Sequence, residues 1–352
     1  MAMLSFSQMA SELRCEYQAH AYYIEGWRRR AVPRAPSLGT ATHLGLAAYW
    51  RGQDWGLAIS TWHDEQLAKL EDNPLVGVEE LDEKVAMLED ICGVSMVLVR
   101  RTMDNMHGWE PVWRNGQPII EQPFTCSLPG WEGYLGYVDA VMEAPDGSTW
   151  IVDWKTRESI PEPSEVDLSL QKPTYQYVLA QNGIDTTGSM IVSIKSSIPK
   201  EPKINKDGSV SRAACDTTWE IYSQAVKRSG GNPDDYLEMR DKLRSKVWIQ
   251  FDRAPRTKET INNIWNDVVV PVADRIRTRR AFQVQPLRNY GSFHCKTCWF
   301  LEPCTESLRG RDPHYILTHE FENVNEMNER NQPEEEIFEI AIPDPEVTRS
   351  EN

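Results

Sequence analysis

Residues 134–155 read YLGYVDAVME, then APDG, then STWIVDWK. Two runs rich in β-branched and aromatic residues flank a Pro-Asp-Gly turn, a pattern typical of a β-hairpin. A turn centred near Asp146 pairs positions whose numbers sum to about 292, which puts Asp139 opposite Asp153. Because side chains alternate along a strand, Lys155 is expected on the same face as Asp153.

Two carboxylates facing each other across a ladder repel, so a divalent cation between them is expected. With a lysine beside them, the arrangement indicates a metal-dependent site that acts on phosphate. Removal of either carboxylate is then expected to leave metal-free stability unchanged or raised. Two other acid-x-Lys triplets, Asp82-Glu-Lys84 and Glu201-Pro-Lys203, lack a partner acid across a hairpin.

Length and composition are those of a soluble globular protein. The 352 residues can bury one large core or two modest ones, and 40% are hydrophobic and 26% charged. No apolar run approaches the roughly 20 residues that cross a bilayer, and the first residues lack a basic segment followed by an apolar one. We therefore expect a cytoplasmic protein without a membrane partner, whose seven cysteines are ligands or buried thiols instead of disulfides.

The net charge of −15 is unevenly distributed. Residues 320–352 hold eleven acidic and two basic side chains, or −9, which leaves −6 for the rest of the chain. The composition of this segment predicts a disordered, solvated tail that repels DNA or recruits a basic partner. Basic clusters at Arg28–Arg30 with Arg34, at 195–212 and at 275–280 fit either a phosphate backbone or solvated helix faces.

Helical patterns account for much of the chain. We expect a helix over 5–30 that contains Cys15, and a second helix from Leu38 in which His43 is more often a packed residue than a ligand. Residues 50–118 appear mainly helical, with tryptophans that serve in packing or stack on bases. Another helix ends at Asn182-Gly183; it places Gln171 and Tyr175 on one face if it has begun by Gln171. Strands at 189–195 and 246–252 and a helix over 257–282, kinked near Pro271, complete the pattern.

Cys295, Cys298 and Cys304 form a Cys-x2-Cys-x5-Cys segment, which is a strong metal-ligand signal. A fourth ligand is needed, and the candidates are Cys15, His294, Cys92, Cys126 and Cys215. A zinc knuckle needs four local ligands, and only His294 is near. The alternative is that Cys15, far upstream, closes the site and joins the two ends of the fold.

The order of these features resembles the RecB-like branch of the PD-(D/E)XK nuclease superfamily. It is most similar to the iron–sulfur exonucleases of the Cas-four type and of AddB nuclease domains, many of them phage-encoded. The resemblance spans about residues 5–310 and implies an α/β fold, with a mixed central sheet flanked by helices and an iron–sulfur staple joining the chain ends. It implies one nuclease domain over 1–318, with a helical insertion at 50–118, a cysteine segment at 291–310 and an acidic tail at 319–352.

The resemblance assigns roles residue by residue. His43, Asp139, Asp153 and the Trp154 carbonyl would bind Mg²⁺ or Mn²⁺, and the histidine favours Mn²⁺. Lys155 would be the catalytic lysine, while Gln171 and Tyr175 would position DNA. The four thiolates of a [4Fe–4S] cluster would be Cys15, Cys295, Cys298 and Cys304. The chain departs from the pattern in two places: Glu16 stands where proline often follows the first cysteine, and Pro173 lies inside the Gln-x3-Tyr segment.

The implied activity is exonucleolytic hydrolysis of DNA, from single-stranded ends, in recombination or repair. A recombination or annealing protein is the implied partner, and the host cytoplasm the location if the gene is viral. Two alternatives stay open: a catalytically inactive DNA-binding protein of this fold, and a zinc-stapled interaction protein without chemistry.

Overall fold

The computed structural model describes residues 3–30, 34–71, 78–161, 168–213 and 215–325. The chain divides into two compact units. Unit 1 comprises residues 1–13 and 32–285, and unit 2 comprises residues 14–31 and 286–352. Within the described ranges, every helix is too short or too polar to cross a membrane.

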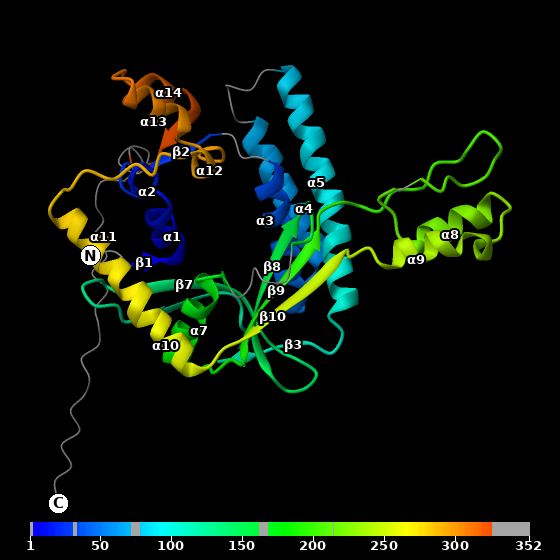
Figure 1. Cartoon of the computed structure of the whole chain (residues 1–352), viewed down its shortest axis with the longest axis horizontal. Coiled ribbons are helices and arrows are strands. Elements are labelled where there is room, and N and C mark those ends of the chain that lie inside the picture. The colour runs from blue at the N-terminus through cyan, green and yellow to red at the C-terminus, as the bar shows by residue number, and fades with distance from the viewer. Residues whose placement is uncertain (1–2, 31–33, 72–77, 162–167, 214, 326–352) are drawn as a thin grey trace, which may run out of the picture. The chain divides into compact units, whose positions relative to one another are not determined.

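Unit 1 is built on a seven-stranded sheet whose main path is β1-β7-β8-β9-β10 (Figure 1). The β1–β7 and β8–β9 pairs are parallel, and the β7–β8 and β9–β10 pairs are antiparallel, so the sheet is mixed. Strands β3 and β6 also pair with β7. The seven strands are β1 (Leu4–Ser5), β3 (Glu110–Pro111), β6 (Ile120–Cys126), β7 (Tyr134–Glu143), β8 (Thr149–Arg157), β9 (Gly188–Lys195) and β10 (Ile249–Pro255). A separate two-stranded ribbon joins β4 (Trp113–Arg114) to β5 (Gln117–Pro118).

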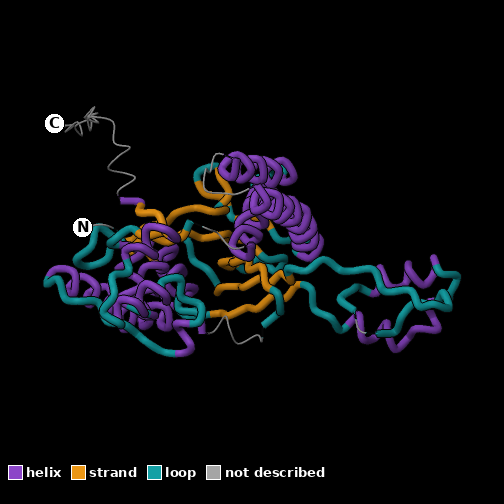
Figure 2. The backbone as a smooth tube through the Cα atoms, turned by 90° about the horizontal axis from the view of Figure 1, so that it is seen from above, coloured by secondary structure: helices purple, strands orange, loops and turns teal. Residues whose placement is uncertain are grey.

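Helices cover both faces of this sheet, and strand β8 shows why. Its Trp150, Val152 and Trp154 pack into a core with helices α3 (Arg34–Trp50), α4 (Trp55–Glu71) and α5 (Val78–Asn105). Ile151, which points to the opposite face, packs into a second core. That core includes residues of α7 (Gln171–Gln181), the π-helical turn η2 (Trp265–Val269) and α11 (Val270–Ala281). Figure 2 shows the strands between these groups of helices, and the predicted fold class is confirmed.

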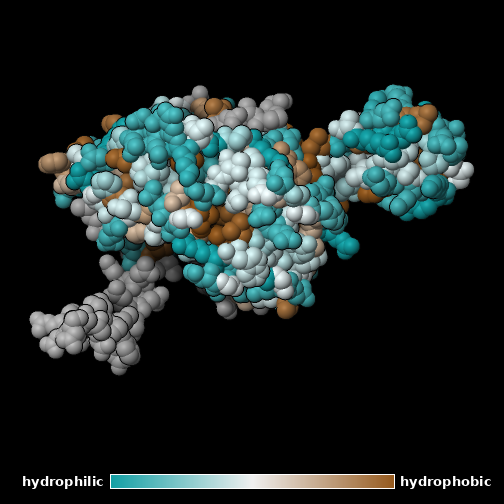
Figure 3. Space-filling view, turned by 90° about the horizontal axis from the view of Figure 1, so that it is seen from below, coloured by the Kyte–Doolittle hydropathy of each residue, from teal (hydrophilic) through white to brown (hydrophobic). Residues whose placement is uncertain are grey.

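The remaining helices of unit 1 are α1 (Phe6–Arg14), of which Arg14 falls in unit 2, α10 (Lys258–Ile264), and a group between β9 and β10. This group, α8 (Trp219–Arg228), the 3-10 helix η1 (Pro233–Tyr236) and α9 (Leu237–Arg244), packs around its own small core. Its surface is largely hydrophilic in Figure 3. The predicted helix over 257–282 is interrupted by η2, and Pro271 follows this π-helical turn as the second residue of α11.

Unit 2 brings together segments from both ends of the sequence. Strand β2 (Trp27–Arg29) pairs with β11 (Phe321–Asn323), and Phe300 stacks on Phe321 with ring centroids 5.0 Å apart. The helices of the unit are α2 (Glu16–Tyr23), α12 (Ser292–Cys295), α13 (Leu301–Leu308) and α14 (His314–Glu320). Residues 321–323 of the expected tail therefore form a strand, and residues 326–352 lie outside the described residues.

The single helix expected over residues 5–30 was wrong. The segment contains β1, α1, α2 and β2, and Cys15 is the N-cap residue of α2, with an extended backbone (φ −165°, ψ 113°). The spacing of apolar residues cannot reveal such a break, because it is helical in both α1 and α2.

Candidate active site

The β7–β8 hairpin has the predicted register. The ladder runs from Glu143–Thr149 to Ala140–Val152, so Asp139 and Asp153 follow directly after its last pair, and the Trp154 N–H donates to Oδ2 of Asp139. The turn is closed by Asp146, whose carboxylate accepts a hydrogen bond from the Ser148 N–H at 3.0 Å. Hairpin formation thus brings two acidic side chains together, as the sequence pattern predicted.

The surroundings of Asp139 disfavour its ionised form more than those of Asp153 do. Burial and the nearby charge of Asp153 raise its pKa to about 6, although His43 and Lys155 act in the opposite direction. Its Oδ2 atom accepts a hydrogen bond from the Trp154 N–H at 3.1 Å, which fixes the carboxylate against the partner strand. At neutral pH it carries a charge that the buried environment disfavours, so a cation there is stabilising.

Asp153 is 4% exposed and has an ammonium group on each carboxylate oxygen. The Nζ atom of Lys155 lies 3.0 Å from Oδ2, and Lys172 contacts Oδ1. Burial opposes the ionisation of Asp153, but the charges of Lys172 and Lys155 outweigh it and lower the pKa. Asp153 is therefore ionised throughout the neutral range.

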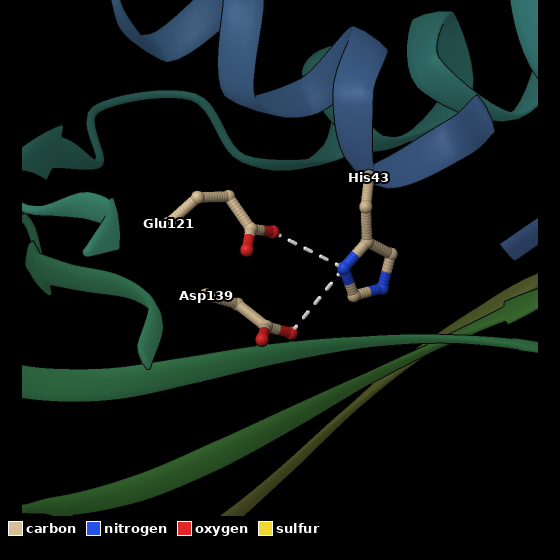
Figure 4. Close-up of side chains that lie close together, drawn as sticks. All are labelled: His43, Glu121 and Asp139. Carbon is tan, nitrogen blue, oxygen red and sulfur yellow. Dashed lines mark hydrogen bonds and ion pairs between the residues drawn. The ribbon is translucent and has the colours of Figure 1, made fainter. Parts of the chain in front are cut away.

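Helix α3 supplies His43 to the same place (Figure 4). Its Nε2–H donates to the Trp154 carbonyl at 2.7 Å, which leaves Nδ1 facing two carboxylates. Nδ1 lies 3.3 Å from Oε1 of Glu121 and 3.6 Å from Oδ2 of Asp139. Burial works against protonation of His43, but Glu121 and Asp139 together raise its pKa. Two carboxylates that could bind the same metal ion as His43 therefore lie close to its ring.

Glu121 was not predicted. It lies on β6, whose pairs Ile120–Ala140 and Gln122–Val138 set it across from Asp139. Its backbone is left-handed, with φ 46°, a conformation that costs a non-glycine residue on the order of 1–3 kcal/mol and often marks a functional site. We searched the described residues for groups of three or more His, Cys, Asp or Glu side chains that could bind a metal. The one such group among these residues whose ligand atoms all lie within 4.8 Å of one another is His43, Glu121 and Asp139.

A pocket of about 540 Å³ adjoins this group. It is lined by Gly39, Thr40, His43, Leu44, Ala47, Arg51, Glu121, Trp154, Lys155 and Thr156. The two lysines that contact Asp153 differ in their access to solvent: the Lys155 side chain is 40% exposed and that of Lys172 is 2% exposed. Lys155 can therefore reach a substrate, and Lys172 cannot.

The donor set fits a divalent cation. Carboxylate and carbonyl oxygens suit Mg²⁺ and Mn²⁺, and one imidazole nitrogen shifts the preference towards Mn²⁺. Because His43 Nε2–H is committed to the Trp154 carbonyl, the neutral ring presents the Nδ1 lone pair to the acids.

A family model of the PD-(D/E)XK nuclease superfamily matches residues 3–305. The chain belongs to the PD-(D/E)XK nuclease superfamily. Nucleases of this superfamily use divalent metal ions, in agreement with the donor set around His43. No curated protein matches.

Two solved structures are similar to this superfamily member. A candidate exonuclease from Eubacterium rectale is 14% identical over 84% of this chain and 87% of that one, with a TM-score of 0.43. The protein SSO0001 is 13% identical over 84% of this chain and 92% of that one, with a TM-score of 0.27. At these TM-scores, the family model alone carries the assignment.

The Gln-x3-Tyr pair of this PD-(D/E)XK chain points inward. Gln171 begins α7, so Pro173 occupies its first turn, and Gln171 Nε2 donates to the Tyr175 hydroxyl at 3.1 Å. Tyr175 is 7% exposed, packs edge-on against Phe6 and lies over Gly136, where an added Cβ would come within 3.1 Å of its ring. Tyr175 is thus largely buried, and its expected role in positioning DNA stays a prediction.

The four predicted cluster cysteines, Cys15, Cys295, Cys298 and Cys304, all lie in unit 2 and line one small pocket. Their sulfur atoms do not converge as closely as donors around a single ion, since no three of these four sulfur atoms lie within 4.8 Å of one another. Burial raises the pKa of Cys298 and Cys304, so without a bound cation these thiols stay protonated.

Hydrogen bonds already join the two ends of the sequence around these cysteines. Glu16 accepts the Leu287 N–H at 2.9 Å, and the Arg14 guanidinium donates to the Thr297 hydroxyl at 2.7 Å. Glu16, which departs from the family pattern, thus has a specific role: a proline at this position could not accept that N–H.

Proposed function

We propose that this PD-(D/E)XK protein is a metal-dependent deoxyribonuclease that hydrolyses phosphodiester bonds. One observation carries the proposal: the hairpin sets Asp139 across from Asp153, with Lys155 3.0 Å from Asp153 and His43 arriving from α3. His43 and the solvent-accessible Lys155 line one pocket, with Asp139 and Asp153 beside them, and this combination suits metal-dependent hydrolysis of a phosphodiester.

His43, Asp139 and Asp153 would hold the cation, with the Trp154 carbonyl beside them and Glu121 as a further carboxylate. A divalent ion there neutralises charge on the scissile phosphate and lowers the pKa of a nearby water. Asp139 gives the clearest reason for a cation there, because burial and the charge of Asp153 raise its pKa and a bound cation would offset both effects.

Lys155 would act on the reacting atoms. Its pKa is raised, because Asp153 and Asp139 outweigh the effect of burial, so it carries a full charge at neutral pH. In hydrolysis, water adds to phosphorus, the bond from phosphorus to the leaving sugar oxygen breaks, and that oxygen takes up a proton. The Lys155 ammonium would orient the water and stabilise the charge that develops on the phosphoryl oxygens.

We further propose exonucleolytic action on single-stranded ends, in recombination or repair, with annealing or recombination proteins of a phage as partners. The support is the motif order in the sequence. The test is digestion of labelled linear and circular single strands with Mn²⁺, with Asp153→Asn as the inactive control. An exonuclease removes the linear strand and spares the circle, whereas equal loss of both identifies an endonuclease.

The same assay separates the other two candidate functions. A DNA-binding protein without activity would retard both strands on a gel and leave them intact. A zinc-stapled interaction protein would do neither. The buried charge pair of Asp153 with Lys172, and the exposed Lys155, favour the nuclease over both.

Unit 2 would carry a [4Fe–4S] cluster on Cys15, Cys295, Cys298 and Cys304. Its support is that all four side chains line one pocket. A single tetrahedral zinc, with Zn–S about 2.3 Å, would draw the sulfurs to about 3.8 Å from one another, closer than this structure places them. Iron and sulfide analysis of protein purified without oxygen tests the proposal: Cys15→Ser should lose iron, and stoichiometric zinc without iron would refute it.

A further inference from the structure

Lys172 is a fully buried lysine at the candidate active site. Only 1% of the residue is exposed, which is rare for a lysine, and its ammonium group contacts Oδ1 of Asp153. It lies in the first turn of α7, and its Nζ also donates to Oε1 of Gln171 at 3.3 Å. Gln171 in turn donates to the hydroxyl of Tyr175, so a chain of contacts runs from the α7 motif to Asp153.

We propose that Lys172 is a positioning residue that holds Asp153 by one oxygen and leaves the other free for the cation and for Lys155. The proposal rests on the proposed nuclease function. It also gives the Gln171–Tyr175 pair a role that suits its burial: the pair orients Lys172, and through it the carboxylate, without touching DNA.

The geometry separates Lys172 from the catalytic lysine. The two ammonium groups lie on different oxygens of one carboxylate, yet the Lys155 side chain is 40% exposed and that of Lys172 only 2%. Lys155 can move from Asp153 towards a phosphate when a cation takes its place. The Lys172 side chain is enclosed in the core, where Asp153 is its acidic partner.

Lys172 also sets the charge of the site. It offsets the negative charge of Asp139 and Asp153 in the metal-free protein, and its positive charge opposes a cation bound nearby. A neutral residue in its place should therefore leave Asp153 poorly oriented for turnover and, at the same time, increase the electrostatic attraction for the ion. If the ion pair had a purely structural role, its loss would not combine slower turnover with tighter metal binding.

The experiment compares Lys172→Met with the parent and with Arg279→Met. Arg279 forms a buried ion pair with Glu12, at 2.6 Å, on helices α11 and α1, which supply none of the site residues. Calorimetric titration with Mn²⁺ alone should show at least tenfold tighter binding by Lys172→Met. Digestion of linear single-stranded DNA should show kcat at least tenfold lower with KM within twofold. Arg279→Met should lower Tm and leave both quantities at the parental values.

Parental kcat, or unchanged or weaker Mn²⁺ binding, in Lys172→Met overturns the proposal. A parent that binds Mn²⁺ but digests no DNA defeats the proposed function alone, because the titration still tests Lys172. Should Lys172→Met fail to fold, the double variant Lys172→Met/Asp153→Asn decides, since it leaves neither charge unpaired in the core. The double variant should then fold with a measurable metal-free Tm, and a double variant that also fails to fold refutes the pairing.

Discussion

The Nζ atom of Lys155 lies 3.0 Å from Oδ2 of Asp153, and the two residues share one face of strand β8. The Asp153 carboxylate is buried, whereas Lys155 lines the pocket in which a substrate would bind. This separation of a buried acid from an accessible lysine leads to different predictions for the two side chains.

Lys155→Met should retain the binding of Mn²⁺ and DNA and lose turnover. The lysine interacts most strongly with charge that develops in the transition state, so kcat should fall by about 10²–10⁴-fold with little change in KM. Steady-state digestion of linear DNA measures kcat and KM, and titration with Mn²⁺ checks the metal site. A variant with weaker metal binding and unchanged kcat would assign Lys155 to the metal site instead.

Asp153→Asn should destabilise the metal-free protein, contrary to the expectation from facing carboxylates alone. The change leaves the buried Lys172 without its partner, and breaking a buried ion pair costs about 3–5 kcal/mol. Urea unfolding in the presence of EDTA gives the free energy of unfolding. Asp139→Asn is the matched control: it removes the repelled acid of the pair, and its stability should equal or exceed that of the parent above pH 7.

The ionisation of Asp139 should lower the stability of the metal-free protein, relative to that of Asp139→Asn, as pH rises from about 4 to about 7. Asp139 has a pKa of about 6 in the folded chain and 3.8 as its ordinary value, so the folded state binds its proton more tightly than the unfolded state. This stabilising contribution is complete below about pH 4 and lost above about pH 6, a loss of about 3 kcal/mol. Across this range, the free energy of unfolding of the parent should fall by this amount relative to that of Asp139→Asn. An identical decline in both would place its origin elsewhere.

Mn²⁺ binding should weaken steeply as pH falls below about 6, and it should release protons at pH 6–7. The ion needs an ionised Asp139 and a neutral His43, and both groups hold their protons more tightly than usual in the metal-free site. Calorimetry in two buffers of different ionisation enthalpy counts the protons. His43→Gln should release fewer protons than the parent, and equal release would remove His43 from the site.

The hairpin was predictable because its determinants are local. A Pro-Asp-Gly turn fixes the register, and the period of two then places Asp139, Asp153 and Lys155. Glu121 was not predictable from a period, because it reaches the site through the pairing of β6 with β7 and a left-handed backbone. A glutamate at φ 46° is visible only in the structure.

Lys172 was missed for a related reason. It lies beside Gln171 in a segment that was read only for its Gln-x3-Tyr spacing, and nothing local indicates that a lysine there is buried. Its partner Asp153 is on β8, so the packing of α7 on the sheet decides the contact. The helix break at Cys15 was missed in the same way. Residues around it form hydrogen bonds with residues 287–297, which are distant in the sequence.

The most direct test of the account is digestion of linear single-stranded DNA by the parent, Asp153→Asn and Lys155→Met, each with Mn²⁺ and with EDTA. The account predicts rapid digestion by the parent with Mn²⁺ alone, and a loss of at least about 10²-fold in both variants. Circular dichroism on the same samples verifies that each variant is folded. Digestion by both folded variants at the parental rate, or digestion by the parent in EDTA, would contradict the assignment of the β7–β8 hairpin as the catalytic centre.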